Sequence, residues 1–409
     1  MFFKKNFYNI LKAIFYSSAL IIFFLLKKNK KFIEVDFARF GGSIYFVEGI
    51  TLLKKYNKIG NTKDIIFFSS FKSCNTQYKK MVARFFPLSN FNLLFIYLKK
   101  ASFFWKINQN LFEKPNWNLN YILKKNQNKI KFSNGNLRFT EQEILLGKTL
   151  LKKFGLNDGD KWVCIHNRDE KYLATEFKNK NFSYHNHRDS LVQNMSDAAE
   201  LFAKNNYFVF RMGKKQSKKL ICKNYKDKII DYAYSDLRSD FLDLFLIGNC
   251  DFYFGGDSGM KSLILSFMKP CYGVNWSPML LYDDPGVFMN FKSNLHPFLF
   301  IFKRVRCLKK GKKLTLREIL SNKVLLSHDN NLYMQNNLLF EENTREEIKN
   351  IANEILQERS GQNIMNKEDV KIKEEFWKIY FKTTGEDQLN YNLPKISPTY
   401  LRHNIDLLD

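Results

Sequence analysis

Residues 161–169 read KWVCIHNRD, residues 207–213 read YFVFRMG, and residues 252–259 read FYFGGDSG. Each segment is a short apolar run that ends in charged or glycine-rich residues. Uninterrupted apolar runs are typical of parallel strands buried on both faces, and open α/β sheets bind ligands beyond the carboxyl ends of such strands. The three segments therefore predict a parallel sheet with a phosphate-binding crevice at the ends of its strands.

The sequence around these segments alternates regularly between strand and helix patterns. Repeated strand–helix units predict a right-handed parallel sheet. We expect strands at 161–165, 207–210, 228–231, 251–254 and 271–274. Helices are expected at 195–204, 240–247 (with Gly248 as its cap) and 260–268.

The N-terminal half predicts a second α/β lobe. Residues 32–42 (FIEVDFARFGG) indicate a strand that ends in a glycine turn, and a helix with an apolar face is expected from Ser43 onward. Further strands are expected at 64–70 and 91–98, and a helix at 140–154, before turn residues at 155–160 that suggest a domain junction. The fold class is therefore α/β with two Rossmann-like lobes, at 32–155 and 156–320, followed by a helical extension at 321–409.

The composition limits the partners. The 409 residues carry 66 Lys plus Arg against 40 Asp plus Glu, a formal charge of +26. The lysines are scattered and no nucleic-acid-binding motif accompanies them, so a nucleic-acid partner is not predicted. The six cysteines form no CxxC pair, which indicates free thiols in a reducing compartment and gives no structural zinc site.

Residues 13–26 form an uncharged apolar stretch flanked by lysines on both sides. With Ile10 and Leu11 it is marginally long enough to span a bilayer, and it can also lie in the interface with its lysines on anionic headgroups. Both readings predict a membrane anchor at 1–31. Together with the free cysteines, this predicts that the rest of the chain lies at the cytoplasmic face of an inner membrane.

Arginine is scarce in the chain, with 13 residues, yet four arginines fall at or near the ends of the predicted strands. Arginine binds phosphate through a planar fork that lysine lacks. We therefore predict ligand contacts for Arg168, Arg188, Arg211 and Arg238, with His166 beside Arg168. The competing interpretation is that these arginines form ordinary ion pairs or support loops.

Three further segments carry candidate residues. Residues 184–189 (YHNHRD) predict a substrate-binding loop that includes Asp189, although His185, His187 and Asp169 leave a zinc site as an alternative. Gly256, Asp257, Ser258 and Gly259 join a strand to a helix, where backbone amides can bind an anion. Arg39, Gly41 and Gly42 follow the first strand and are expected to face the ligand from the N-terminal lobe.

These motifs, in the order VCIHNRD, HNHRDS, FVFRMG and GGDSG, resemble a group of bacterial glycosyltransferases found with surface-polysaccharide genes. More remotely, the strand that ends in His-x-Arg is similar to fucosyltransferases of the GT-B type. This resemblance implies two domains with a cleft, a donor diphosphate bound by Arg168, and a nucleotide at Gly256–Gly259. The chain lacks the second adjacent arginine of the fucosyltransferases, so the resemblance does not extend to fucose as the donor.

The expected function is transfer of a sugar from a nucleotide-diphosphate sugar to a cell-surface glycan or a lipid-linked acceptor. Arg168 and the helix-terminal amides would stabilise the leaving group without a metal or other cofactor. Asp169, Asp189 and Glu48 are the candidates for the general base. A non-catalytic nucleotide- or glycan-binding protein of the same fold is the alternative.

Overall fold

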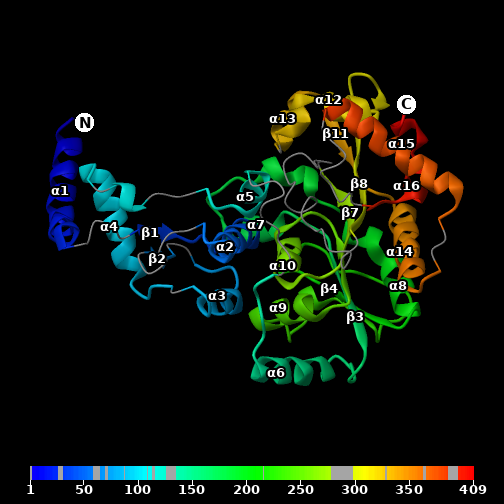
Figure 1. The fold of residues 1–409 in the computed structure, drawn as a ribbon, viewed down its shortest axis with the longest axis horizontal. Helices are drawn as coiled ribbons and strands as arrows, with labels where there is room; N and C mark the ends of the chain where they lie inside the picture. The colour runs from blue at the N-terminus through cyan, green and yellow to red at the C-terminus, as the bar shows by residue number, and fades with distance from the viewer. Residues whose placement is uncertain are drawn as a thin grey trace. The chain divides into compact units, whose positions relative to one another are not determined.

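The computed structural model describes residues 2–25, 31–58, 65–69, 72–86, 88–107, 109–112, 116–125, 135–214, 216–277, 298–327, 329–362, 365–385 and 395–409. The chain divides into two compact units, Met1–Asn126 and Gln127–Asp409. We call them unit 1 and unit 2 and describe each by itself (Figure 1).

Unit 2 is built on one seven-stranded sheet in which every neighbouring pair of strands is parallel. The strand order is β12-β8-β7-β6-β3-β4-β5. The strands are β3 (Lys161–His166), β4 (Tyr207–Arg211), β5 (Ile229–Ile230), β6 (Phe252–Gly255), β7 (Cys271–Trp276), β8 (Phe298–Phe302) and β12 (Lys395–Ile396). The five strands predicted for this half of the chain are confirmed, and the buried apolar side chains of β3, β4, β6 and β7 explain why their sequence signal was clear.

The strand order contains a topological switch. From β3 the chain adds β4 and β5 on one side, and it then returns to add β6, β7, β8 and β12 on the other. The switch point lies between β3 and β6, whose last residues, His166 and Gly255, are direct register partners. In open parallel sheets, ligands bind beyond the carboxyl ends of the strands at this position.

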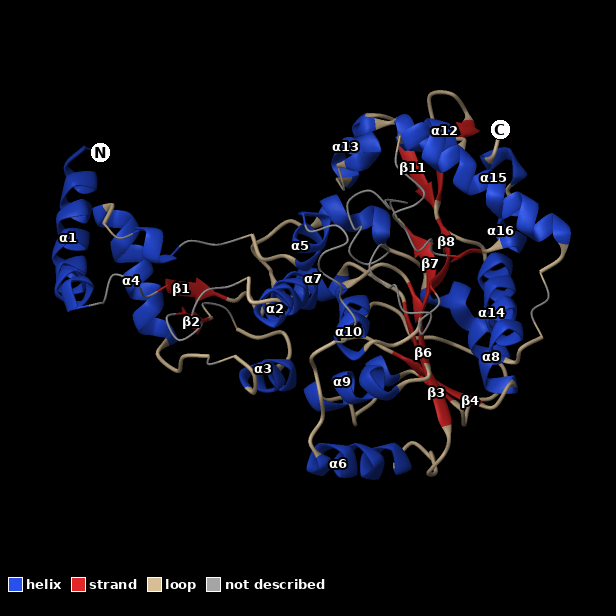
Figure 2. Cartoon of the chain, in the orientation of Figure 1, coloured by secondary structure: helices blue, strands red, loops and turns tan. Residues whose placement is uncertain are grey.

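Helices cover both faces of the unit 2 sheet (Figure 2). Figure 2 shows α9 and α10 on one face and α8 and α14 on the other. The remaining helices surround these layers. The helices of unit 2 are α6 (Glu141–Lys152), α7 (Lys171–Glu176), α8 (Ser196–Lys204), α9 (Asp240–Asn249), α10 (Gly259–Phe267), α12 (Leu316–Ser321), α13 (Asn330–Gln335), α14 (Arg345–Arg359), α15 (Lys367–Thr384) and α16 (Pro398–His403), with short 3-10 turns η3 (Ser183–Arg188), η4 (Val192–Met195), η5 (Tyr232–Tyr234), η6 (Lys323–Leu326) and η8 (Ile405–Leu407).

The last part of the chain is built into unit 2 more closely than its amphipathic pattern suggested. It contains the predicted helices, but it also supplies β12 to the main sheet. Strand β11 (Leu338–Glu341) pairs with β9 (Arg304–Cys307), which in turn pairs with β10 (Lys312–Lys313), in a three-stranded antiparallel sheet. None of these strands was predicted, and the pairings of β11 with β9 and of β12 with β8 join segments that are far apart in the sequence.

Unit 1 contains a two-stranded parallel sheet and a larger number of helices. The elements are α1 (Phe2–Leu25), β1 (Lys31–Glu34), α2 (Phe40–Lys55), β2 (Ile65–Phe68), α3 (Thr76–Ala83), α4 (Asn92–Trp105), η2 (Gln109–Phe112) and α5 (Leu119–Lys125). The predicted strands that became β1 and β2 are confirmed in type, although Asp64 and Ser70 lie outside the described residues.

Two predictions for unit 1 are wrong. Residues 91–98 were expected to form a strand, but they belong to α4, because the apolar pattern continues with helical spacing through the buried Phe95, Leu98 and Ala101. The expected glycine turn is absent, since Gly41 and Gly42 lie in the first turn of α2. In unit 2, Gly248 likewise lies inside α9 rather than at its cap.

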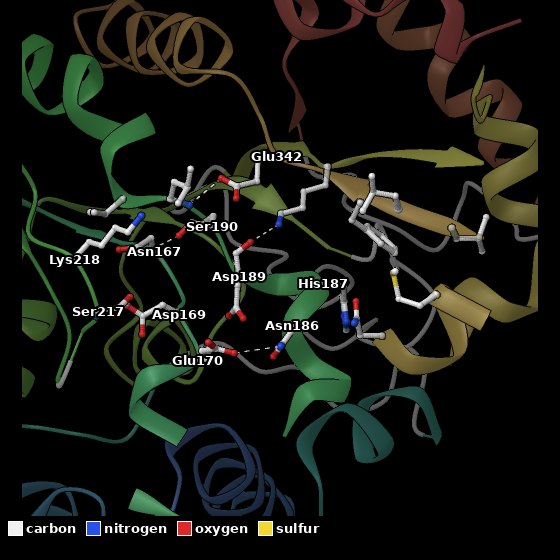
Figure 3. A pocket seen from close by; sticks show the side chains of 18 of the residues that line it. Asn167, Asp169, Glu170, Asn186, His187, Asp189, Ser190, Ser217, Lys218 and Glu342 are labelled. Atoms are coloured by element: carbon white, nitrogen blue, oxygen red, sulfur yellow. Dashed lines mark hydrogen bonds between the residues drawn. The ribbon is translucent and has the colours of Figure 1, made fainter. Parts of the chain in front are cut away.

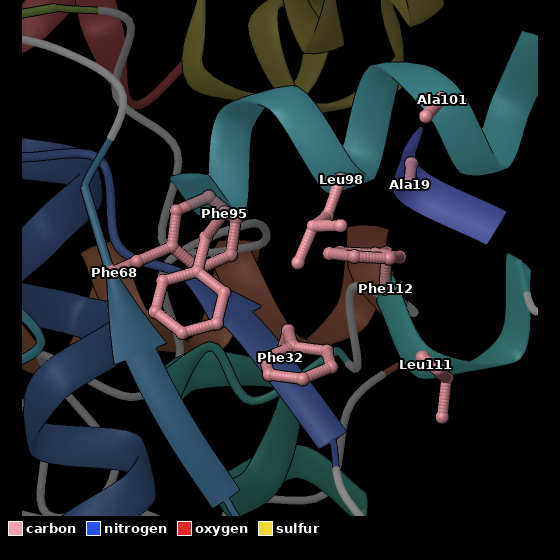
Figure 4. Packing of buried hydrophobic residues seen from close by; sticks show 8 residues of the cluster. All are labelled: Ala19, Phe32, Phe68, Phe95, Leu98, Ala101, Leu111 and Phe112. Atoms are coloured by element: carbon pink, nitrogen blue, oxygen red, sulfur yellow. The ribbon is translucent and has the colours of Figure 1, made fainter. Parts of the chain in front are cut away.

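The core of unit 1 joins α1 and α4 to the small sheet. Ala19 of α1 is buried together with Leu98 and Ala101 of α4 and Phe32 of β1 (Figure 4). Tyr97 donates a hydrogen bond from its hydroxyl to the Phe15 carbonyl oxygen at 2.6 Å. Among the described residues, α1 included, no helix has the length and apolarity that crossing a bilayer requires. Residues 26–30 of the expected anchor lie outside the described residues.

Candidate functional site

The ends of β3 and β6 form a tightly packed edge at the switch point. His166 Nδ1 lies 3.2 Å from Ser258 Oγ, and the Gly256 amide donates to the His166 carbonyl oxygen at 3.2 Å. A Cβ atom on Gly255 would lie 2.2 Å from that carbonyl oxygen, which leaves no room for a side chain. The predicted HNRD and GGDSG segments therefore meet directly at the switch point.

His166 is a neutral group at this edge. Burial, assisted by the nearby Arg211 and Arg168 guanidinium groups, lowers the pKa of His166 to about 3. An imidazole with this pKa carries no charge at neutral pH. His166 can therefore orient Ser258 by a hydrogen bond, but it adds no positive charge for binding phosphate.

Two cationic side chains converge on Asp257 beside this edge. Arg188 donates to the Asp257 carbonyl oxygen from Nη2 at 2.8 Å, and the same nitrogen lies 3.1 Å from the Asp257 carboxylate. Lys261 Nζ lies 2.9 Å from the other carboxylate oxygen and 4.7 Å from the centre of the Trp276 ring. With Ser258 and the first amides of α10, these residues form what we call the switch-point cluster: His166, Arg188, Asp257, Ser258 and Lys261.

Arg168 and Asp189 form an ion pair on the neighbouring loop. Arg168 is only 8% exposed. Burial raises the pKa of the Asp189 carboxyl to about 6, although the Arg168 charge opposes this shift. The loop is held on both sides, because the Ser190 amide donates to the Arg168 carbonyl oxygen at 3.0 Å, and Asn167 Nδ2 donates to the Ser190 carbonyl oxygen at 2.9 Å. The structure thus joins two predicted residues, Arg168 and Asp189, in one pair.

A pocket of about 500 Å³ opens next to this pair (Figure 3). Its walls come from the loops after β3 and β4, from η3 and the residues that follow it, from Lys303, and from α13 and β11. The lining residues are Asn167, Asp169, Glu170, Asn186, His187, Asp189, Ser190, Leu191, Val192, Arg211, Ser217, Lys218, Lys303, Asn330, Met334, Leu338, Leu339, Phe340 and Glu342. We call this cavity the acidic pocket, because it contains four carboxylates and two lysines besides the buried Arg211.

The Asp169 carboxylate accepts hydrogen bonds that stabilise the loops around it. One carboxylate oxygen accepts a hydrogen bond from the Lys171 amide at 3.1 Å, and the other accepts from the amide and the hydroxyl of Ser217, both at 2.9 Å. These bonds connect the loops after β3 and β4. They leave Asp169 less suited to the role of a general base than Asp189.

The other two predicted arginines are held by internal partners. Arg211 is fully buried behind the pocket wall and donates to Asp231, Asn167 and Gln216 at 3.1–3.2 Å. Arg238 pairs with Asp243 and donates to the Gly213 carbonyl oxygen. Arg211 therefore positions Asn167 in the pocket wall, whereas Arg238 does not line the pocket.

The N-terminal candidates lie in unit 1. Arg39 directly precedes α2, Gly41 and Gly42 lie in its first turn, and Glu48 is fully buried further along the same helix. Ligand contact by Arg39, Gly41 and Gly42 and the role of Glu48 as a general base stay predictions.

The zinc alternative finds no matching geometry in the described part of the chain. Among those residues, no group of three or more His, Cys, Asp or Glu side chains is placed to hold a metal ion. His187 instead packs against the rings of Tyr333 and Phe340, with centroid separations of 5.0 and 5.6 Å.

Sequence reasoning missed two lysines at the site. Lys303 is 3% exposed, donates to the Asp189 carbonyl oxygen, and has a pKa that burial lowers to about 8. It directly follows the apolar run FLFIF (298–302), which is the same signal that identified the other strand ends. Lys261 could have been found by its position four residues after Asp257, one helical turn along α10.

Comparisons with known proteins find similarity to solved structures alone. No family model matches the sequence, and no curated protein matches it. The structure is similar to a glycosyltransferase of family 9 from Veillonella parvula, with a TM-score of 0.40 and 9% identity, over 66% of this chain and 86% of that chain. It is also similar to the ADP-heptose lipopolysaccharide heptosyltransferase II of E. coli, with a TM-score of 0.41 and 10% identity, over 66% of this chain and 89% of that chain.

Proposed function

We propose that the protein is a glycosyltransferase that moves a sugar from a nucleotide-diphosphate sugar to a glycan or a lipid-linked acceptor, and that unit 2 binds the donor. The observation that carries the proposal is the switch-point cluster. Arg188 and Lys261 meet there at the end of a doubly wound parallel sheet, beside the N-terminus of α10 and next to a pocket. Anionic ligands bind at such helix ends, and arginine adds a fork that matches phosphate oxygens.

We assign the diphosphate to Arg188 and Lys261 rather than to Arg168. Arg168 lies on the neighbouring loop and is paired with Asp189, whereas Arg188 and Lys261 lie together beside the N-terminus of α10 and both contact the Asp257 carboxylate. A diphosphate would compete with the Asp257 carboxylate for these two cations. These side chains supply the positive charge that neutralises the leaving group, which in our proposal requires no divalent cation.

Asp189 is our candidate for the general base. In the transfer, the acceptor oxygen forms a bond to the anomeric carbon and its proton passes to Asp189, while the bond between the anomeric carbon and the diphosphate oxygen breaks and its electron pair leaves with the diphosphate. A base with a pKa of about 6 is mostly ionised at neutral pH and is still basic enough to take up that proton. Arg168 then acts as a positioning residue for Asp189.

The test is turnover of a nucleotide-sugar panel by the full-length protein, with lipid-linked oligosaccharide as the acceptor. Nucleoside diphosphate release is measured for the natural protein and for Arg188→Ala. Release that depends on the donor and falls in the variant supports the proposal. Donor binding without any release favours the alternative of a non-catalytic nucleotide-binding protein, and absence of both binding and release contradicts each of them.

We also propose that unit 1 binds the surface of an anionic membrane. Residues 1–126 contain 22 Lys plus Arg against 5 Asp plus Glu, which is a formal charge of +17 out of the +26 of the whole chain. Helices α1 and α4 both leave large apolar side chains exposed, among them Ile14 (67%), Leu93 (83%) and Phe103 (53%). Exposed apolar side chains on a basic helical layer are typical of proteins that lie on a bilayer.

Co-sedimentation with vesicles tests this placement. Binding to vesicles with anionic phosphatidylglycerol is expected to exceed binding to pure phosphatidylcholine, and to weaken as salt screens the charges. The double variant Ile14→Glu/Leu93→Glu should lose it, whereas Leu145→Glu on α6, at another exposed leucine, should not. Equal binding by all three proteins, or no preference for the anionic lipid, contradicts the proposal.

A further inference from the structure

The acidic pocket has two chemically different walls. One wall, from the end of β3 through η3 to Ser190, presents carboxylates, amides and hydroxyls. The other wall, from α13 and β11, presents the apolar Met334, Leu338 and Phe340. A ligand that fits both walls needs a polar edge and an apolar face.

The pocket is rich in carboxylates, although the chain as a whole is strongly basic. Although the protein has a formal charge of +26, the pocket brings together Asp169, Glu170, Asp189 and Glu342. Its cations are Lys218, Lys303 and Arg211. Lys303 and Arg211 are buried, and Lys303 donates to the Asp189 carbonyl oxygen. A phosphate or another anion inside this pocket would lie among four carboxylates, which disfavours its binding.

Glu342 and Asp189 each have one carboxylate oxygen available for a ligand. Glu342 accepts from the Leu191 amide at 2.8 Å and from Asn194 at 3.2 Å, both through Oε2. Asp189 accepts from Arg168 through Oδ1. Within the described part of the chain, no hydrogen bond reaches Glu342 Oε1 or Asp189 Oδ2. An ionised carboxylate oxygen only accepts hydrogen bonds, so these atoms require a ligand that donates them.

We infer that the acidic pocket binds an uncharged, polyhydroxylated ring, that is, a neutral sugar unit. Its hydroxyls donate to Glu342 Oε1 and Asp189 Oδ2, and its C–H face packs on Leu338 and Phe340. A volume of about 500 Å³ lies within the usual range for small-molecule sites, which is about 300–1,000 Å³. This inference rests on the proposed function. It adds that the sugar is neutral, and that acidic sugars are excluded by the carboxylates.

The probes for the test are matched pairs of monosaccharides that differ in one carboxylate: glucose with glucuronate, and galactose with galacturonate. Binding to the full-length protein is measured by saturation-transfer NMR at millimolar concentrations. We expect at least one neutral sugar to bind and its uronate to bind at least tenfold more weakly. Equal binding of both members of a pair, or no saturable binding of any neutral sugar, overturns the inference.

Variants of the lining residues test whether the sugar detected by NMR binds in the acidic pocket. Glu342→Gln keeps an oxygen for the Leu191 amide but loses the negative charge, so we expect weaker binding of the neutral sugar and a smaller preference over the uronate. Phe340→Ala should weaken binding of the neutral sugar. The matched control is Glu200→Gln, because Glu200 also accepts from backbone amides and an asparagine, but lies outside the pocket. Identical binding by Glu342→Gln and the natural protein overturns the inference.

A nucleoside diphosphate added to the same samples separates the two proposals. If the diphosphate binds and its binding requires Arg188, but no sugar binds, the proposed function stands and only this inference is overturned. Adding the nucleotide sugar shows whether the bound ring represents the donor sugar or the acceptor sugar. A donor sugar displaces the free monosaccharide from the pocket, whereas an acceptor sugar stays bound while the donor occupies the switch-point cluster.

Discussion

Within unit 2, the switch-point cluster and the acidic pocket differ in the sign of the charge that they offer. The cluster places two cations around one carboxylate, whereas the pocket places four carboxylates beside two lysines. The sequence analysis predicted one phosphate-binding crevice at these strand ends. In our proposal, a basic chain separates the binding of a phosphate from the binding of a sugar, because Arg168 and Arg188 are paired with different carboxylates.

The largest effect is expected from Gly255→Ala, which breaks the edge that the two sites share. The new Cβ would lie 2.2 Å from the His166 carbonyl oxygen, so β3 and β6 would have to separate. We expect the melting temperature to fall by roughly 10 °C, from about 3 kcal/mol of overpacking. Gly256→Ala is the matched control, because its Cβ would meet the Val274 carbonyl oxygen at an ordinary 3.5 Å. Equal melting temperatures for the two variants would show that the edge is not packed as described.

Arg188→Ala is expected to weaken nucleoside diphosphate binding by about 30-fold, the lower end of the cost of about 2–5 kcal/mol for truncating one partner of a buried charged pair, because Arg188 is only partly buried. Isothermal titration calorimetry with a panel of nucleoside diphosphates provides the measurement. Arg345→Ala removes an exposed arginine that pairs loosely with Asp197, and it should leave the affinity unchanged. If Arg188→Ala binds the diphosphate with unchanged affinity, the phosphate site does not lie at the switch-point cluster.

Lys261→Met should weaken diphosphate binding by less, about tenfold, because lysine contributes one point charge without a fork. The methionine side chain keeps most of the packing against Trp276. Lys378→Met, at an exposed position, is the control. If Lys261→Met binds the diphosphate as tightly as this control does, Lys261 does not contribute to binding. Arg188 would then be the one cation of the cluster that binds the diphosphate.

The smallest effect is expected in the pH dependence of turnover. If Asp189 is the base, its ionised form is active, so the rate should rise with pH through about 6 and level off by pH 7. The sign follows from burial, which disfavours the ionised carboxylate and raises its pKa. Arg168→Lys keeps the charge but not the fork, so the midpoint of the profile should shift. A profile that is flat between pH 5 and 7.5 would exclude Asp189 as the base.

The sequence allowed the prediction of the parts of the fold that depend on local patterns. The strands that became β3, β4 and β6 are apolar runs whose side chains are buried, and their charged ends identified His166, Arg168 and the GGDSG turn. The pairing of those ends was not predictable. That Arg168 binds Asp189, or that Arg188 binds Asp257, depends on loops that are 21 and 69 residues apart in the chain.

The acidic pocket could not be derived from the sequence. Its apolar wall comes from β11 and α13, and β11 is placed by antiparallel pairing with β9, more than 30 residues earlier. The strand pattern at 91–98 failed for the opposite reason, because a short apolar run fits a helix and a strand equally well until its continuation to Trp105 is considered.

The most direct measurement is a crystal structure of the protein with the nucleotide sugar that binds best in the panel. Our account predicts the diphosphate oxygens against Arg188, Lys261 and the first amides of α10, with the sugar ring or an acceptor ring between Glu342 and Phe340. A diphosphate bound inside the pocket by Lys218 and Lys303, with the switch-point cluster unchanged, would contradict it.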